Sequence, residues 1–187
     1  MEVVLDWISG ICWTFVYLLA IYLGIRNKKY YIPAFCICLN FSWELWVVFA
    51  RSVQGAPISS GFISQILWLL CDVGVLVTWF LFATNLSVFS KCVLFGGSVI
   101  IIAVPTLALN FWAETAFIMN FIMSVSFLFR IDKQMKQSLP IAILKCIGTL
   151  SATILNGVIY HDGFILLVGG LCLIADVLFI YVVACKE

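Results

Sequence analysis

Long apolar stretches follow one another along almost the whole chain, and this pattern constrains the fold more than any other feature. A helix that crosses the hydrocarbon core of a bilayer needs about 20 mainly apolar residues. The 187-residue chain holds seven such stretches, separated by short polar or turn-forming segments: 4–25, 31–50, 62–84, 91–110, 113–130, 140–159 and 164–184. We therefore predict an all-α membrane protein, a compact bundle of seven transmembrane helices that forms a single domain over residues 1–187.

The composition excludes a water-soluble domain. Hydrophobic residues make up 65% of the chain and charged residues only 10%, whereas soluble domains carry about 25% charged residues. The most basic segment is the short Arg26–Lys29 stretch and the net charge is +1, so nucleic-acid binding is not expected. The eight cysteines lie in or beside apolar stretches and are interpreted as small packing residues.

The division between the fourth and fifth stretches is the least marked. The apolar run from Cys92 to Phe129 is interrupted only by Asn110, Trp112 and Glu114. Because this run is too long for one membrane span, the sequence predicts a turn near 110–115.

Basic residues predict how the bundle is oriented in the membrane. With seven spans, one side holds eight loop or terminal cations and the other side holds Arg51 alone; the eight are Arg26, Lys28, Lys29, Lys91, Arg130, Lys133, Lys136 and Lys186. The positive-inside rule then places the N-terminus outside and the C-terminus in the cytoplasm. Acidic Glu2 before the first stretch is the reverse of a signal peptide, which favours a retained helix. Lys145, about one turn inside the sixth stretch, is expected to snorkel to the cytoplasmic face.

Three carboxylic acids lie within the apolar stretches: Glu44, Asp72 and Asp176. A charged side chain at the centre of a bilayer costs at least a few kcal/mol, so these acids should face the bundle interior or a cavity. No lysine or arginine is expected near the bilayer centre to neutralise them. We predict that Glu44 and Asp176 share one central pocket, with Asp72 nearby. The alternative is that each acid is only a hydrogen-bond partner between helices.

Aromatic and amide side chains lie at helical spacing beside these acids, and residues three or four positions apart share a helix face. They are Asn40 and Trp43 beside Glu44, Trp68 beside Asp72, and Trp79 seven positions beyond Asp72. Such rings either pack against lipid and core or line a cavity, where they would stabilise a cationic guest.

Several chemistries lack the residues that they require. The only histidine, His161, lies in a short turn, so neither a histidine-based metal site nor a serine triad is expected. Cys36 and Cys38 lack the spacing of a metal knuckle, and no glycine-rich phosphate loop is present. We therefore expect no metal and no cofactor.

The motifs Asn40-x-x-Trp43-Glu44 and Trp68-x-x-x-Asp72, together with Asp176 in the last apolar stretch, resemble those of a known family. It comprises small seven-helix membrane terpene cyclases: fungal meroterpenoid and indole-diterpene cyclases of the paspaline-synthase type, and bacterial indole-sesquiterpene cyclases. The resemblance implies that Glu44 and Asp176 are the essential acids. With these acids as the catalytic pair, we predict that the substrate is contacted by Asn40, Trp43, Trp68, Asp72 and Trp79.

What the resemblance implies about the reaction agrees with the physics of a buried acid. A carboxylic acid in an apolar interior favours its neutral form, and neutral Glu44 or Asp176 could protonate an epoxide or a terminal alkene. Tryptophans would stabilise the migrating cation. The partners implied are a prenylated lipophilic substrate and membrane lipid, while the oligomeric state stays open.

Two alternatives come from other functional classes. The first is a small proton- or cation-coupled transporter that uses the three acids as a relay. Transporters of this kind often show inverted repeats and paired helix breaks, whereas Pro105 is the only proline in the middle of a predicted span. The second is a seven-helix receptor or assembly factor without catalysis, against which the short loops argue.

Overall fold

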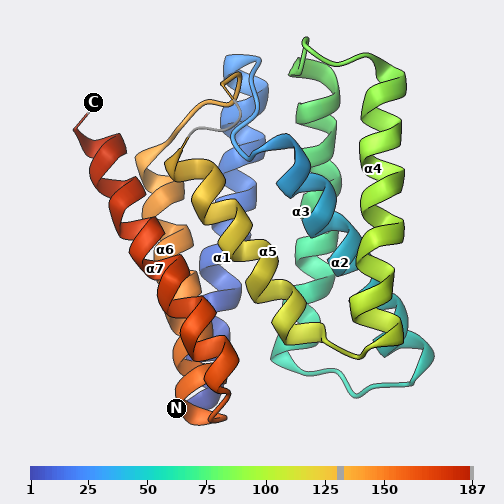
Figure 1. Cartoon of the computed structure of the whole chain (residues 1–187), viewed down its shortest axis with the longest axis vertical. Coiled ribbons are helices and arrows are strands. Elements are labelled where there is room, and N and C mark those ends of the chain that lie inside the picture. Colours follow the sequence, from blue (N-terminus) through green and yellow to red (C-terminus); the bar gives the residue numbers. More distant parts are fainter. Residues whose placement is uncertain (130–132, 186–187) are drawn as a thin grey trace.

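The computed structural model describes residues 1–129 and 133–185, and this part of the chain folds into seven helices without a strand (Figure 1). The helices are α1 (Glu2–Asn27), α2 (Ala34–Val53), α3 (Ser60–Phe82), α4 (Val88–Ala103), α5 (Trp112–Leu128), α6 (Leu139–Thr153) and α7 (Gly163–Ala184). Two short π-helical segments, η1 (Val104–Ala108) and η2 (Ile154–Ile159), extend α4 and α6. The predicted all-α fold is confirmed.

The helices have the length and composition that a membrane requires. Counting each π-helical segment with its helix, six of them are long and apolar enough to cross a bilayer, and α5 is a shorter apolar helix. Successive helices run in opposite directions, so that α1 begins at one end of the bundle and α7 ends at the other (Figure 1). The chain is thus a multi-pass integral membrane protein.

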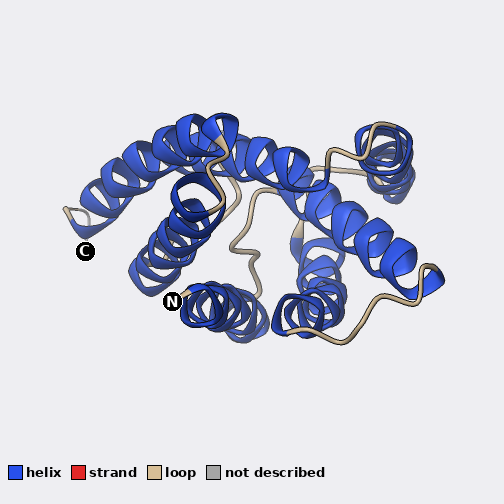
Figure 2. Cartoon of the chain, turned by 90° about the horizontal axis from the view of Figure 1, so that it is seen from below, coloured by secondary structure: helices blue, strands red, loops and turns tan. Residues whose placement is uncertain are grey.

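Six helices form a closed ring. Going round the ring, α1 packs against α6, α6 against α7, α7 against α5, α5 against α2, α2 against α3, and α3 against α1. The seventh helix, α4, packs on the outside of α2. Figure 2 shows this arrangement from the end at which α1 begins. Because the ring is closed, side chains from distant parts of the sequence meet at its centre.

The break between α4 and α5 follows from a proline and a left-handed residue. Pro105 lacks the N–H group that would continue the α-helical bonding, and the backbone widens into the π-helical segment η1 around it. Asn110 then adopts a φ of 58°, a conformation that asparagine tolerates better than most residues. The new helix begins at Trp112, which confirms the predicted turn.

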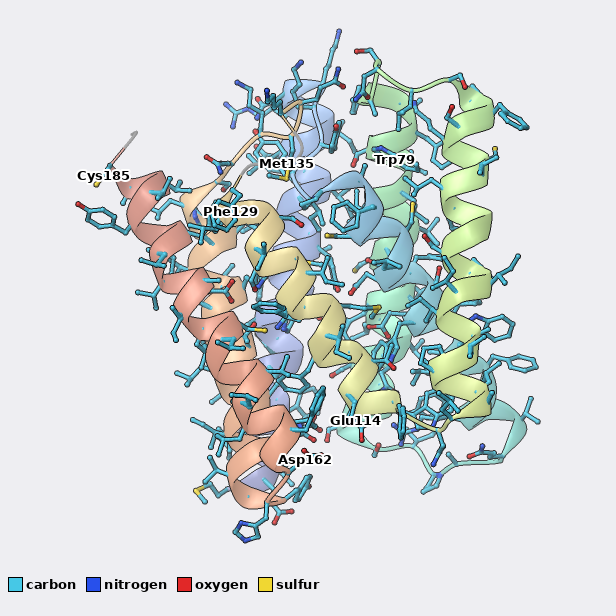
Figure 3. All side chains as sticks on the ribbon, viewed as in Figure 1. Trp79, Glu114, Phe129, Met135, Asp162 and Cys185 are labelled. Carbon is cyan, nitrogen blue, oxygen red and sulfur yellow. The ribbon has the colours of Figure 1, made fainter. Side chains whose placement is uncertain are left out.

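Two loops close the end of the ring at which α1 stops. Tyr30 and Ile32 in the first loop and Met135 in the second are each 1% exposed, and Figure 3 labels Met135 at this end. The backbone N–H of Lys136 donates to the carbonyl oxygen of Tyr30 at 3.0 Å, which ties the loops together. We call this the closed end of the bundle.

The basic residues of the predicted cytoplasmic side gather at the closed end. Arg26, Lys28 and Lys29 finish α1 or follow it, and Lys91 lies in the first turn of α4. Arg51 lies at the opposite end, in the last turn of α2. Arg130 and Lys186 belong to the predicted set but lie outside the described residues. Which end faces the cytoplasm stays a prediction.

Candidate active site

A cavity of about 110 Å³ lies inside the ring. Its wall is built by α1, α2, α3, α5 and α6 and is mainly aromatic and apolar. The aromatic residues that line it are Trp13, Tyr17, Trp43, Trp68 and Phe117. The polar residues that line it are Ser9, Asn40, Glu44, Asn120 and Thr149. An apolar pocket with a few converging polar groups is the usual form of a small-molecule site.

Glu44 is the acidic residue of this site and lies in the middle of α2. Its side chain is 1% exposed and lines the cavity. Among the described residues, its Oε2 atom has no hydrogen-bond partner, and no cation forms a salt bridge with the carboxyl group. A buried polar atom without a partner costs roughly 1–3 kcal/mol. The side chain that carries this atom lines the cavity.

Asn40 connects three helices next to Glu44. Its Nδ2 atom donates to the hydroxyl oxygen of Tyr17 on α1 and, at 3.3 Å, to Oδ2 of Asp72 on α3. Tyr17 is 3% exposed and Asp72 is 1% exposed. The amide thereby holds a phenol ring against the cavity and provides a partner for a carboxylate. Of the three side chains, Asn40 and Tyr17 line the cavity, whereas Asp72 does not.

Hydrogen bonds donated by the indole N–H groups fix two of the cavity tryptophans. Trp43 Nε1 donates to the carbonyl oxygen of Trp112 at 2.9 Å. Trp68 Nε1 donates to the carbonyl oxygen of Gly10 at 3.3 Å and to Thr14 Oγ1 at 3.2 Å. A tryptophan whose N–H is satisfied in this way leaves the rest of its ring for contact with a guest. Both residues were predicted from the sequence to contact substrate, and both line the cavity.

Asp176 differs from Glu44 because its carboxylate is paired with a cation. Its two carboxylate oxygens accept hydrogen bonds from Lys145 Nζ at 2.7 Å and 2.9 Å, and both side chains are 1% exposed. Lys145 therefore does not snorkel to the membrane surface, and the expectation that no cation would neutralise the acids is wrong for Asp176. The reason is that α6 and α7 are neighbours in the ring, which places a cation from α6 opposite an acid from α7.

The expectation of one pocket shared by both acids is also wrong, because Glu44 lines the cavity and Asp176 does not. Trp79 likewise lies away from it: the ring is fully buried in the apolar core, with Lys91 Nζ 5.9 Å from its centre. Although Trp79 shares a helix face with Asp72, it is too near the closed end of α3 to reach the cavity.

Several cavity residues were not singled out from the sequence, among them Asn120, Thr149, Trp13 and Tyr17. Asn120 on α5 donates from Nδ2 to Thr149 Oγ1 on α6 at 3.0 Å, and its buried Oδ1 atom has no partner among the described residues. Trp13 and Tyr17 are in contact on α1, with ring centres 5.9 Å apart. An amide in the middle of an apolar stretch was a detectable signal at Asn120. No sequence spacing links the other three to the site.

The cavity opens toward the end of the bundle at which α1 begins. There a larger vestibule of about 510 Å³ lies among the first turns of α1, α3 and α5 and the end of η2. Both spaces are lined by Ser9, Trp43, Trp68, Ala116, Phe117 and Ala152. The vestibule has the size of a typical small-molecule site, and its inner wall is shared with the smaller cavity that holds Glu44.

Comparison with known proteins identifies the family of this chain. The family described as Pyr4-like transmembrane terpene cyclases matches residues 2–160. The chain is 36% identical over 70 residues to the Pyr4-family terpene cyclase mfmH of Annulohypoxylon moriforme, and 32% identical over 69 residues to the terpene cyclase macJ of Penicillium terrestre. These segments cover 37% and 35% of this chain.

The same segments cover only 27% and 24% of the two relatives, so the chain matches about a quarter of their length. No solved structure matches the chain significantly. The family match, in contrast, extends from the start of α1 to the end of η2 and includes all of the cavity-lining residues. The chain belongs to the Pyr4-like transmembrane terpene cyclases.

Proposed function

We propose that this protein is a membrane-embedded terpene cyclase in which Glu44 delivers the proton that starts cyclisation. The observation that carries the proposal is the buried Oε2 atom of Glu44, which has no partner among the described residues and belongs to a side chain on an aromatic cavity wall. The family to which the chain belongs supports the reaction class. The substrate class is a prenylated lipophilic molecule that enters from the bilayer.

The reaction begins when the neutral carboxyl group of Glu44 protonates an epoxide oxygen or a terminal alkene of the substrate. In the epoxide case the C–O bond breaks, the oxygen becomes a hydroxyl group, and the tertiary carbon becomes a cation. An internal alkene of the same chain then attacks that carbon, which forms a ring and moves the cation along the chain. Loss of a proton from the last cation ends the reaction, and Glu44 must be protonated again before the next turnover.

The cavity wall is suited to the intermediate. Ring faces of Trp13, Trp43 and Trp68 would stabilise a passing carbocation through cation–π attraction. The hydrogen bonds that the indole N–H groups of Trp43 and Trp68 donate keep these two rings in place. Exclusion of water from a site of this kind prevents early capture of the cation.

Within this proposal Asp176 has a different role from Glu44. The sequence and the resemblance treat the two acids alike, whereas the ion pair with Lys145 favours a structural role for Asp176. An ionised carboxylate that accepts two hydrogen bonds from an ammonium group has no proton to donate. Asp72 is interpreted as the partner that orients Asn40.

The test is cyclisation by membranes that contain wild-type protein or single variants. A prenylated epoxide or alkene is supplied, and cyclised product is measured by mass spectrometry. Glu44→Gln retains the shape of the side chain but not its transferable proton, so turnover should fall about 10²- to 10⁴-fold, as is typical for loss of a general acid. Asp72→Asn should be milder. Glu114→Gln is the matched control, because Glu114 lies at the open end of the bundle (Figure 3) but does not line the cavity.

Normal product formation by a well-folded Glu44→Gln variant would defeat the proposed mechanism. A wild-type protein that takes up a solute with protons or cations, and forms no product, would instead establish the transporter alternative.

A further inference from the structure

The hydroxyl group of Tyr17 uses only one of its hydrogen-bonding functions within the described part of the chain. Tyr17 lies on α1, is 3% exposed and lines the cavity. Its ring contacts that of Trp13, with ring centres 5.9 Å apart and ring planes at 37°. The hydroxyl oxygen accepts a hydrogen bond from Nδ2 of Asn40. A phenol oxygen that accepts one hydrogen bond still has its own hydrogen to donate.

The direction of the bond between Asn40 and Tyr17 follows from Asp72. The same Nδ2 atom of Asn40 also donates to Oδ2 of Asp72 at 3.3 Å, and an ionised carboxylate can only accept hydrogen bonds. The nitrogen of the Asn40 amide, and not its oxygen, must therefore face Asp72. Because Tyr17 contacts that same nitrogen, its oxygen accepts and its hydrogen points elsewhere. This hydrogen has no acceptor among the described residues.

Asn40 brings Tyr17 close to Glu44. Asn40 precedes Glu44 by four residues on α2, so the two side chains share a helix face one turn apart. Tyr17, which Asn40 holds, lines the same cavity as both of them. The neutral carboxyl group of Glu44 and the phenol of Tyr17 are then two O–H donors beside one space. An oxygen atom with two lone pairs can accept a hydrogen bond from each of them.

We propose that Tyr17 is a second catalytic residue, whose O–H group donates a hydrogen bond to the epoxide oxygen that Glu44 protonates. This inference rests on the proposed cyclase function. As the C–O bond breaks, its electron pair moves to the oxygen, which takes up the proton of Glu44. The carbon becomes a cation, Glu44 becomes a carboxylate, and Tyr17 keeps its proton. Because the oxygen gains negative charge as the bond breaks, the hydrogen bond from Tyr17 stabilises the transition state more than the bound substrate.

Asn40 and Asp72 act through Tyr17 in this proposal. Asp72 fixes the direction of the Asn40 amide, and the amide N–H then holds the phenol oxygen. Hydrogen bonds in a chain polarise one another, so the bond that Tyr17 accepts strengthens the bond that it donates. The proposal thereby gives the network of Asn40, Tyr17 and Asp72 a chemical function beyond the joining of α1, α2 and α3.

The kinetic test uses a prenylated epoxide and the Tyr17→Phe variant in membranes, with thermal unfolding in detergent as the check of folding. We expect kcat to fall about 10²-fold, as is typical when one donor to a developing oxyanion is removed, whereas KM should change little. Tyr31→Phe is the matched control. Tyr31 is 7% exposed and accepts a hydrogen bond from Asn27 Nδ2 at 2.6 Å, but it does not line the cavity. Equal kcat values for wild type and a folded Tyr17→Phe variant would overturn the proposal.

A binding test needs no turnover and separates a hydrogen bond from a purely structural role. A terpenoid ketone, which carries an acceptor oxygen in place of the epoxide and cannot open, is bound to the protein in membranes. The stretching frequency of its isotope-labelled carbonyl group, measured by infrared difference spectroscopy, falls when the oxygen accepts a hydrogen bond. The band should lie at lower frequency in wild type and Tyr31→Phe than in Tyr17→Phe. The same frequency in all three proteins would show that Tyr17 does not donate to the guest.

The outcomes separate this inference from the proposed function. A carbonyl band that depends on Tyr17, without any cyclised product from the epoxide, would leave the hydrogen bond standing and defeat the cyclase. Cyclisation by wild type together with full activity of Tyr17→Phe would defeat only the role of Tyr17.

Discussion

Lys145 and Asp176 form a buried ion pair between α6 and α7, with Nζ 2.7 Å and 2.9 Å from the two carboxylate oxygens. Nζ also donates to Ser124 Oγ on α5 at 2.6 Å and lies 5.7 Å from the ring centre of Trp13 on α1. One ammonium group thus contacts side chains from three other helices of the ring. Since Trp13 also lines the cavity, the pair supports part of the cavity wall.

Breaking this pair should destabilise the fold. Asp176→Asn leaves the ammonium group of Lys145 buried without a counter-charge, and loss of one partner of a buried pair costs about 3–5 kcal/mol. We expect a clear fall in Tm in detergent, together with a loss of activity that follows the loss of folded protein. The Lys145→Met/Asp176→Leu double variant, which removes both charges, should recover most of the stability. If Asp176→Asn were as stable as wild type yet inactive, Asp176 would be an essential acid after all.

Gly148 on α6 should be essential for the position of Trp13. A Cβ atom at this position would lie 2.8 Å from Trp13 Cδ1, so the ring would have to move. Gly148→Ala should therefore reduce kcat/KM for cyclisation about tenfold or more, because small misplacements in a site are costly. Gly170→Ala is the matched control, since nothing lies within 4 Å of a Cβ there. Equal kcat/KM values for the two variants would show that cyclisation does not depend on the position of Trp13.

Lys91 should stabilise the end of α3. Its side chain is 5% exposed, and Nζ donates to the carbonyl oxygens of Phe80 and Ala83 at 2.8 Å and 2.6 Å. A cation at a helix C-terminus satisfies carbonyls that lack partners within the helix. Lys91→Met should lower the free energy of unfolding by about 1–3 kcal/mol, as measured by thermal unfolding in detergent. Lys136→Met, which changes an exposed side chain at the same end, should have little effect.

The closed end of the bundle should face the cytoplasm. The prediction follows from the basic residues that gather there, set against Arg51 at the other end. Two kinds of reporter check this: one is active only in the cytoplasm, and the other is active only outside it. At a position after Cys185 or beside Lys133, only the first kind should be active. At a position before Glu2, only the second kind should be active. A C-terminal reporter that is active outside the cytoplasm would contradict this orientation and the outward-facing vestibule.

Local sequence was sufficient to predict the membrane class and the helices. Hydropathy is a property of each stretch by itself, and an apolar stretch of spanning length must satisfy its backbone internally. Asn110, Trp112 and Glu114 likewise marked the division between α4 and α5, because they interrupt an apolar run that is too long for one span. The inward position of Glu44 and of its neighbours Asn40 and Trp43 could also be predicted, because a carboxylic acid that faces lipid from an apolar helix costs several kcal/mol of free energy.

Only the tertiary structure decided which of these polar groups are paired. Glu44, Asp72 and Asp176 look alike in the sequence, yet Asp176 meets Lys145, Asp72 meets Asn40, and Oε2 of Glu44 has no partner among the described residues. The difference depends on which helices are neighbours in the ring. Burial and pairing are contacts between residues far apart in the chain, such as Lys145 and Asp176 on separate helices. Hydropathy and helical spacing describe one helix at a time and hold no information about its partners.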